Sequence, residues 1–191
     1  MEHTFGNPLG WDSVDLARVY AHHYHQGQFR RISGVPYIDH PAAVARMLKE
    51  HGDSVDCQVV GWLHDTLEDT ILSYNEIRDV FGEYVAEGVR YLTRYESQEG
   101  YKRKILSAPR EIQRVKIFDL IDNLTTIEHL KDQSIKKKVV DSIQFYIPLA
   151  EEVVPDLALP IEDQLRRYYN LKQCPFTDFC SDLPKGYEKM W

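Results

Sequence analysis

Residues 59–70 read VVGWLHDTLEDT, an apolar stretch that runs directly into one histidine, three acids and two threonines. The spacing of the apolar residues predicts a helix that continues through Asp69. On such a helix His64 lies one turn from Glu68, and Asp65 lies one turn from Asp69. No lysine or arginine occurs within a turn of these acids, so their charges repel one another. Taken alone, the segment is typical of a solvated helix face, although a bound divalent cation would also balance the charge.

The composition is that of an ordinary globular protein. The chain has 191 residues, 43% hydrophobic and 28% charged, which is enough for one buried core. Its net charge of −7 argues against non-specific binding to nucleic acid or to an anionic membrane. No stretch approaches the length of a membrane span, and the acidic N-terminus is unlike a signal peptide. The three cysteines form no CxxC pair, which favours a reducing cytoplasm over a disulfide framework.

Helical periodicity follows along most of the chain, and no segment shows the alternation of a strand. We expect helices over about residues 12–26, 41–51, 55–69, 73–81, 85–92, 109–130, 135–150 and 161–170. Asp12 is placed to cap the first helix, and SYNE at residues 73–76 has the pattern of a capping box. Residues 95–108 have a weaker, more basic pattern. We therefore predict an all-α fold with one helical-bundle domain over residues 1–172 and a C-terminal tail over residues 173–191.

A divalent cation at the acidic segment would need further ligands from other helices. PYIDHP at residues 36–41 places His40 between two prolines, and KIFDLIDN at residues 116–123 places Asp119 in an apolar run. Imidazole and carboxylate together suit an ion such as Mn²⁺ or Fe²⁺ better than a thiolate site would. Each residue alone has an ordinary explanation, because a buried acid can simply be capped or paired.

Taken in order, the motifs resemble the HD-domain hydrolases of the RelA/SpoT family, which cleave the alarmone (p)ppGpp, and especially the small single-domain members. The similar segments are AHHYHQGQFRRISGVPYIDHPAAVA (21–45), VVGWLHDTLEDT (59–70), IRDVFGEYVAEGVRYLT (77–93), YKRKIL (101–106) and VKIFDLIDNLTTI (115–127). The resemblance implies an HD-type helical bundle. It also implies Mn²⁺-dependent hydrolysis of the 3′-pyrophosphate, which yields GDP or GTP plus pyrophosphate.

The resemblance also implies a role for each matching residue. One Mn²⁺ would be ligated by four residues, His40, His64, Asp65 and Asp119. Glu68 and Asp69 would position and deprotonate the attacking water, in agreement with the general-base chemistry that hydrolysis at neutral pH needs. Substrate contacts are implied for Arg30, Arg31, Ser33, Tyr37, Arg103, Lys104, Asn123 and Thr126.

The sequence departs from the family pattern in one loop and in its length. GQFRRISG is one residue longer than the usual GQxRKSG, so Arg30 and Arg31 compete for the phosphate-binding role that suits an arginine. Only a short tail follows Lys172, so we expect no synthetase activity.

The substrate could instead be (p)ppApp or the 2′-phosphate of NADPH, and a non-catalytic nucleotide sensor is a further alternative. The expected partner is a small nucleotide, and the sequence does not indicate an oligomeric state.

Overall fold

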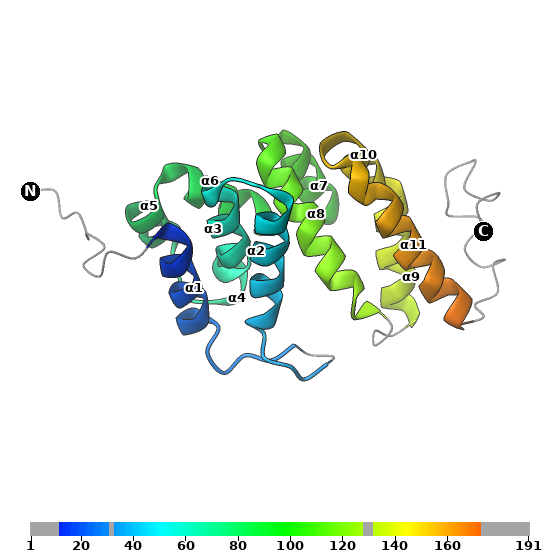
Figure 1. Ribbon diagram of the computed structural model, residues 1–191, viewed down its shortest axis with the longest axis horizontal. Helices are drawn as coiled ribbons and strands as arrows, with labels where there is room; N and C mark the ends of the chain where they lie inside the picture. Colours follow the sequence, from blue (N-terminus) through cyan, green and yellow to red (C-terminus); the bar gives the residue numbers. More distant parts are fainter. Residues whose placement is uncertain (1–11, 31–32, 128–131, 173–191) are drawn as a thin grey trace, which may run out of the picture. The chain divides into compact units, whose positions relative to one another are not determined.

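The computed structural model describes residues 12–30, 33–127 and 132–172. Its helices are α1 (Ser13–Tyr24), α2 (Asp39–His51), α3 (Val55–Leu63), α4 (Thr66–Asp69), α5 (Tyr74–Phe81), α6 (Glu83–Leu92), α7 (Gln98–Ser107), α8 (Arg110–Leu124), α9 (Asp132–Asp141), the π-helical segment η2 (Ser142–Tyr146), α10 (Ile147–Val153) and α11 (Pro155–Lys172) (Figure 1). Within the described ranges the extended pairing is a single bridge between Phe29 and Pro36. The predicted all-α fold is confirmed.

Two compact units make up the chain, one up to Asp119 and one from Leu120 onward. The boundary falls inside α8, and each unit is described by itself below. The single domain expected over residues 1–172 stays a prediction, and the expected tail lies outside the described residues. Within the described ranges, none of the helices combines the length and the apolar character that crossing a membrane requires.

Local sequence signals fix several helix ends as predicted. The Asp12 side chain accepts a hydrogen bond of 2.8 Å from the N–H of Asp15 at the start of α1. Ser73 and Glu76 form both bonds of a capping box before α5. Gly52 ends α2 with a φ of 85°, in the left-handed region that favours glycine. These caps satisfy backbone groups that have no partner inside the helix.

The helix predicted over residues 55–69 is interrupted, so that prediction is wrong at its most important point. α3 ends at Leu63 and α4 begins at Thr66. Asp65 has φ −95° and ψ −6°, a conformation that departs from regular helix and is common at functional sites. The hydroxyl of Thr66 donates a hydrogen bond of 2.6 Å to the carbonyl of Leu63 and so closes the turn. The N–H of Asp69 still donates a hydrogen bond of 2.9 Å to the carbonyl of Asp65, so this one-turn pair is kept, whereas His64 belongs to neither helix.

Other boundaries differ from the prediction by smaller amounts. The weakly periodic segment over residues 95–108 contains a full helix, α7, which begins at a Ser97 cap. α2 begins at Asp39, two residues before Pro41, and α11 begins at Pro155 rather than near residue 161. Weak periodicity missed α7 because its buried side is small, with only Tyr101 and Ile105 buried inside the helix.

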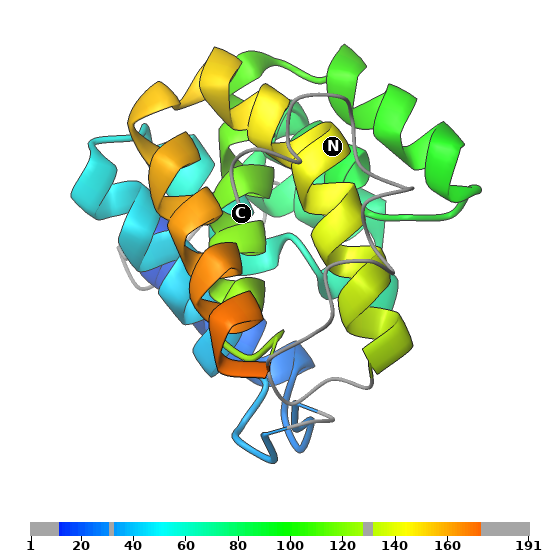
Figure 2. The same ribbon diagram turned by 90° about the vertical axis from the view of Figure 1, so that its right-hand side faces the viewer.

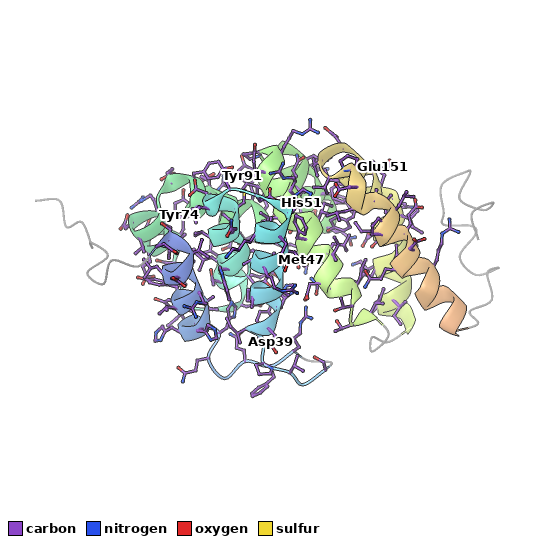
Figure 3. The ribbon with its side chains drawn as sticks, in the orientation of Figure 1. Asp39, Met47, His51, Tyr74, Tyr91 and Glu151 are labelled. Carbon is purple, nitrogen blue, oxygen red and sulfur yellow. The ribbon has the colours of Figure 1, made fainter. Side chains whose placement is uncertain are left out.

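The first unit is built around α3, which packs against α1, α2 and α6. Residues 57 and 59–63 of α3 are all buried, as expected for a helix that is apolar nearly all round. Its neighbours contribute their own apolar stripes, which include Ala17, Ala21, Val44, Leu48, Val85 and Val89. In Figure 3, Asp39 and His51 mark the first and last residues of α2, the helix that lies against α3.

The second unit contains the end of α8, then α9, η2, α10 and α11. Figure 2 shows the chain turning at η2 and α10, so that α9 and α11 run in opposite directions. In η2 the N–H of Ile147 donates to the carbonyl of Ser142, a π-type bond across five residues. Pro148 follows directly and has no N–H to donate, which accounts for a change of hydrogen-bond pattern at this place.

The close packing of α2 on α3 depends on Gly61. A Cβ atom at this position would lie 2.7 Å from Cδ1 of Leu48 and 3.2 Å from Cα of Ala45. The neighbour that requires a residue without a side chain at position 61 is therefore α2. Because α2 and α3 carry different residues of the candidate site, Gly61 also controls the distance between them.

We expect Gly61→Ala to lower the free energy of unfolding by about 1–2 kcal/mol, because the buried helix α2 must move to make room. Gly100→Ala is the matched control, since the nearest neighbours of its Cβ are Glu96, an exposed residue, at 2.9 Å and Ser97 at 3.4 Å rather than a buried helix. That change should be neutral or stabilising by up to about 1 kcal/mol through helix propensity. Urea unfolding of both variants measures the difference, and equal stabilities would contradict the packing argument.

Candidate metal centre and catalytic site

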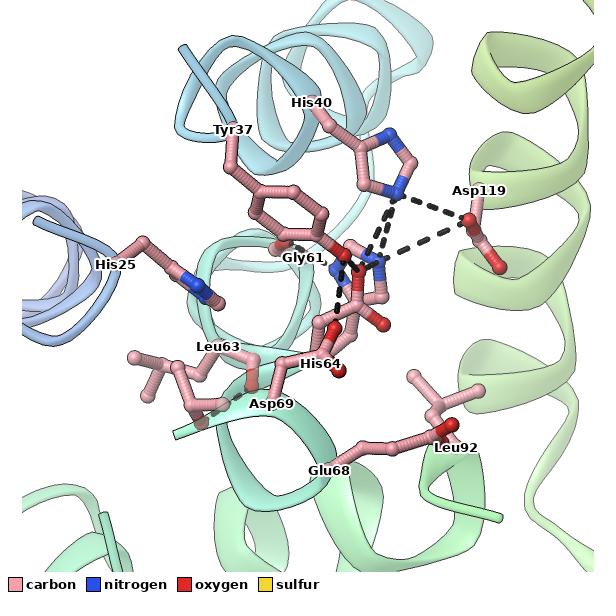
Figure 4. Close-up of polar contacts among 12 residues, drawn as sticks. His25, Tyr37, His40, Gly61, Leu63, His64, Glu68, Asp69, Leu92 and Asp119 are labelled. Atoms are coloured by element: carbon pink, nitrogen blue, oxygen red, sulfur yellow. Dashed lines mark hydrogen bonds and ion pairs between the residues drawn. The ribbon is translucent and has the colours of Figure 1, made fainter. Parts of the chain in front are cut away.

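Three separate parts of the first unit bring four side chains together. His40 comes from the first turn of α2, His64 and Asp65 from the turn between α3 and α4, and Asp119 from α8 (Figure 4). Nε2 of His40 lies 3.1 Å from Nε2 of His64 and 3.1 Å from Oδ1 of Asp119. Oδ2 of Asp65 lies 3.0 Å from Nε2 of His64 and 3.4 Å from Nε2 of His40. The distance from Nε2 of His64 to Oδ1 of Asp119 is 3.7 Å.

These distances fit ligands around one divalent ion. Donor atoms about 2.1 Å from an octahedral ion lie about 3.0 Å from their neighbours in the coordination sphere. His40, His64 and Asp65 offer donor atoms within 4.8 Å of one another, and Asp119 adds an oxygen close to both imidazoles. Two nitrogens and two carboxylate oxygens suit ions such as Mn²⁺, Fe²⁺ or Zn²⁺. The residues present therefore fit a bound metal.

A backbone carbonyl orients the ring of His64. Nδ1 of His64 lies 2.9 Å from the carbonyl oxygen of Gly61, which can only accept, so Nδ1 carries the proton. In the neutral ring the lone pair is then on Nε2, the atom that faces His40 and Asp65. Metal-binding histidines commonly have such a partner for the second nitrogen. The last turn of α3 thus prepares His64 as a ligand.

The electrostatics of the cluster favour a cation at its centre. Burial alone would raise the pKa of Asp65, but His64 and His40 outweigh it and hold this pKa well below its usual value. Burial opposes ionisation of Asp119 as well, yet Lys116 and the two histidines lower its pKa. The pKa of His64 is raised, because Asp65 and Asp119 together exceed the effect of burial. Two ionised carboxylates thus attract positive charge to the point where the imidazoles meet.

Tyr37 connects this cluster to Asp69. Its hydroxyl lies 2.5 Å from Oδ2 of Asp65 and 3.1 Å from Oδ2 of Asp69, and donates its proton between them. Burial and the charge of Asp65 raise the pKa of Tyr37, so the hydroxyl keeps that proton. His25 supports the ring of Tyr37 at a centroid distance of 4.9 Å. Gln28 accepts from Nδ1 of His25 and donates to the backbone carbonyl of Asp69.

Glu68 points away from Asp69 on the short helix α4 (Figure 4). Its Oε2 accepts a hydrogen bond of 2.9 Å from the backbone N–H of Arg94, and its Oε1 lies 4.0 Å from the Arg94 guanidinium. Adjacent residues on a helix point about 100° apart, so Glu68 and Asp69 reach different neighbours although both lie on α4. The structure therefore places Asp69 beside the cluster through Tyr37, and places Glu68 against the loop after α6.

The residues expected to bind substrate lie in three places. Arg30 and Ser33 belong to the loop before α2, where the N–H of Arg30 donates to the carbonyl of Val35 at 2.9 Å. Arg31 lies outside the described residues. On α7, Arg103 is exposed, whereas Lys104 forms an ion pair of 2.9 Å with Glu96 and donates to the carbonyl of Thr93. Asn123 and Thr126 belong to the second unit, whose placement relative to this cluster is not described.

Sequence reasoning missed several side chains that contact the cluster. Lys116 donates a hydrogen bond of 2.6 Å to Oδ2 of Asp119, and the spacing of three residues on one helix was a usable signal for it. Gln28 and the carbonyl of Gly61 had no such signal, because both contacts depend on tertiary packing. The structure brings together all four predicted metal ligands, and it separates the two acids predicted to act on water.

Comparisons with known proteins agree with this geometry. The sequence profile of the HD domain family matches residues 17–153. A guanosine-3′,5′-bis(diphosphate) 3′-pyrophosphohydrolase from Aquifex aeolicus is 34% identical over 171 residues, which cover 84% of this chain and 24% of that protein. The zebrafish (Danio rerio) enzyme named guanosine-3′,5′-bis(diphosphate) 3′-pyrophosphohydrolase MESH1 is 32% identical over 144 residues, 71% of this chain and 80% of that protein.

A solved structure shares the fold. It is described as a metazoan ortholog of SpoT that hydrolyzes ppGpp, and it matches with a TM-score of 0.70 at 19% identity, over 85% of this chain and 96% of that one. The chain spans only 18–24% of the length of several bacterial relatives, some of which are named GTP pyrophosphokinase. The profile match over residues 17–153 and the large share of MESH1 that is spanned show that this chain belongs to the HD domain family, as a homologue of the MESH1 and SpoT proteins.

Proposed function

We propose that the chain is a Mn²⁺-dependent hydrolase that removes the 3′-pyrophosphate of (p)ppGpp and yields GDP or GTP plus pyrophosphate. The observation that carries the proposal is the convergence of His40, His64, Asp65 and Asp119 on one point. The name of the zebrafish relative, of which the chain covers 80%, supports the substrate and the direction of the reaction. For that reason the proposal contains no synthetase activity. A cytoplasmic location stays a prediction.

In this proposal the four clustered residues hold the metal ion. A bound divalent ion polarises a phosphoryl oxygen and lowers the pKa of a coordinated water. Gly61 fixes the tautomer of His64 through its carbonyl, and Tyr37 fixes the rotamer of Asp65 through its hydroxyl. Both supports keep the donor atoms in place before the ion and the substrate arrive, which reduces the reorganisation that binding requires.

Asp69 and Glu68 are proposed to act on the attacking water. Water attacks the phosphorus bonded to the ribose 3′-oxygen, a new P–O bond forms, and the bond from phosphorus to the 3′-oxygen breaks. One water proton passes to a carboxylate, for which Glu68 is the proposed general base, and the departing ribose 3′-oxygen takes up a proton from solvent, which gives a 3′-hydroxyl and free pyrophosphate. The N–H of Arg94 positions Glu68, and Tyr37 positions Asp69.

The basic residues of the loop before α2 and of α7 are proposed to bind the phosphates. These are Arg30, Arg31, Arg103 and Lys104, with Ser33, Asn123 and Thr126 as further nucleotide contacts. They would explain how a chain of net charge −7 attracts an anionic substrate. Tyr37 is proposed to act mainly through the two acids that its hydroxyl contacts, rather than on the substrate directly.

We expect the metal-free chain to bind one Mn²⁺ per molecule in titration calorimetry. His64→Ala should abolish this binding or weaken it more than about 100-fold, because it removes a ligand from the centre of the cluster. His22→Ala is the matched control, since His22 is an exposed histidine on α1, outside the cluster. Equal Mn²⁺ affinities for the two variants would contradict the metal site.

The substrate is tested by measuring pyrophosphate and phosphate release from ppGpp, pppGpp, pppApp and NADPH, with and without Mn²⁺. We expect pyrophosphate from ppGpp and pppGpp only when Mn²⁺ is present. Faster turnover of pppApp, or phosphate release from NADPH alone, would move the proposal to one of these other substrates. Binding of the nucleotides without any turnover would instead identify a sensor domain.

Glu68→Ala should reduce kcat for ppGpp by about 100-fold or more while Mn²⁺ affinity stays the same, because the proposed base is lost and the ligands are kept. Asp65→Ala should lose both metal binding and turnover. Calorimetry and a single-turnover assay on each variant separate the two roles. If Glu68→Ala kept its full rate, the assignment of the general base would be wrong.

A further inference from the structure

The two carboxylate oxygens of Asp119 have different neighbours. Oδ1 faces Nε2 of His40 at 3.1 Å and Nε2 of His64 at 3.7 Å. Oδ2 accepts a hydrogen bond of 2.6 Å from Nζ of Lys116. The side chains of Lys116 and Asp119 are only 17% and 7% exposed, so solvent does little to loosen this ion pair. Oδ1 therefore faces the histidines of the cluster, whereas Oδ2 is engaged by Lys116.

Lys116 also contacts Tyr101. Its Nζ lies 5.4 Å from the centroid of the Tyr101 ring, within the range of a cation–π interaction. The ring is buried, and its hydroxyl donates a hydrogen bond of 2.8 Å to the carbonyl of Leu92 at the end of α6. The ammonium group of Lys116 thus contacts both a fixed aromatic ring and Asp119, which limits the positions that it can take.

An engaged Oδ2 restricts how Asp119 can bind a metal ion. A small octahedral ion takes carboxylates through one oxygen at about 2.1 Å, whereas Ca²⁺ takes six to eight ligands at about 2.3–2.6 Å and often uses both oxygens of a carboxylate. With Lys116 on Oδ2, Asp119 offers only Oδ1 to the cluster. Ca²⁺ therefore loses Oδ2 of Asp119 as a possible ligand. A small octahedral ion loses no ligand, because it would use Oδ1 alone.

We propose that Lys116 determines the metal selectivity of the site, by keeping Asp119 a one-oxygen ligand and so favouring Mn²⁺ over Ca²⁺. Tyr101 is the positioning residue that keeps Lys116 in this place. The inference rests on the metal site of the proposed function. It concerns residues that contact the ligand Asp119 and not the cluster itself.

The test measures the ratio of the Ca²⁺ dissociation constant to the Mn²⁺ dissociation constant in the unaltered full chain and in its variants. Calorimetry gives the Mn²⁺ constant. The Ca²⁺ constant comes from competition, in which the electron paramagnetic resonance signal reports the Mn²⁺ that Ca²⁺ releases. Lys116→Met should lower this ratio about tenfold, because Oδ2 becomes available and Ca²⁺ gains more from it. Removal of one positive charge strengthens the binding of both divalent ions alike. The ratio therefore isolates the effect on coordination from the effect on charge.

Lys104→Met is the matched control for charge. Nζ of Lys104 also lies 5.4 Å from the Tyr101 ring, but it pairs with Glu96 rather than with a residue of the cluster. We expect this variant to keep the Ca²⁺ to Mn²⁺ ratio within about twofold, which is the precision needed to see a tenfold effect. An equal change in the two lysine variants would overturn the proposal in favour of a general charge effect.

Tyr101 provides a second route if Lys116→Met fails to fold because the buried carboxylate of Asp119 loses its ion pair with Lys116. Tyr101→Leu removes the ring and should lower the ratio about threefold, whereas Tyr101→Phe keeps the ring and should leave it unchanged. If Lys116→Met folds and its ratio is unchanged, the selectivity role is refuted. If Lys116→Met does not fold, an unchanged ratio in Tyr101→Leu refutes it. Both results leave the proposed function intact. Absence of Mn²⁺ binding in the unaltered chain refutes the metal site itself, so the two failures are distinguishable.

Discussion

One buried carboxylate, one half-buried carboxylate and two imidazoles meet at one point in the first unit, and the rest of the site follows from the need to compensate their charge. Asp65 and Asp119 stay ionised although burial opposes it, since the histidines, and Lys116 beside Asp119, stabilise the charged forms. A divalent ion can be coordinated by all four donor atoms at once, whereas a proton can be shared by only two of them. The helices that supply these atoms must be held at a fixed separation. The close contact of α2 with α3 at Gly61 does this for His40 and His64.

The break between α3 and α4 divides the acidic segment into parts with different neighbours. In a continuous helix, Glu68 would lie above His64 and Asp69 above Asp65. In the observed turn, Tyr37 joins Asp65 to Asp69, while Glu68 binds the backbone of Arg94. Glu68 therefore has a different partner from the two aspartates, which share Tyr37. The cost of interrupting the helix is small, because Thr66 satisfies the carbonyl of Leu63.

The sequence predicted the fold class and the metal cluster for different physical reasons. Helix ends at Asp12, Gly52 and Ser73 depend on local capping chemistry, which a single sequence displays. Asp119 was singled out as an acid inside an apolar run and His40 as a histidine between two prolines at a helix start, and motif resemblance supplied the pairing. The turn at His64 and Asp65 was not predicted, since every residue there is compatible with a helix. Its conformation is set by tertiary contacts such as the one from Tyr37, which no local pattern contains.

One buried aromatic ring connects the metal side of the site to the water side. Tyr101 lies against Lys116, which holds Asp119, and its centroid is 6.0 Å from the guanidinium carbon of Arg94, whose backbone N–H binds Glu68. Its hydroxyl also binds the end of α6, directly before the loop that carries Arg94. Each contact is worth only about 0.5–2 kcal/mol. Because all of them meet on one buried ring, the supports of Asp119 and of Glu68 share a common contact in Tyr101.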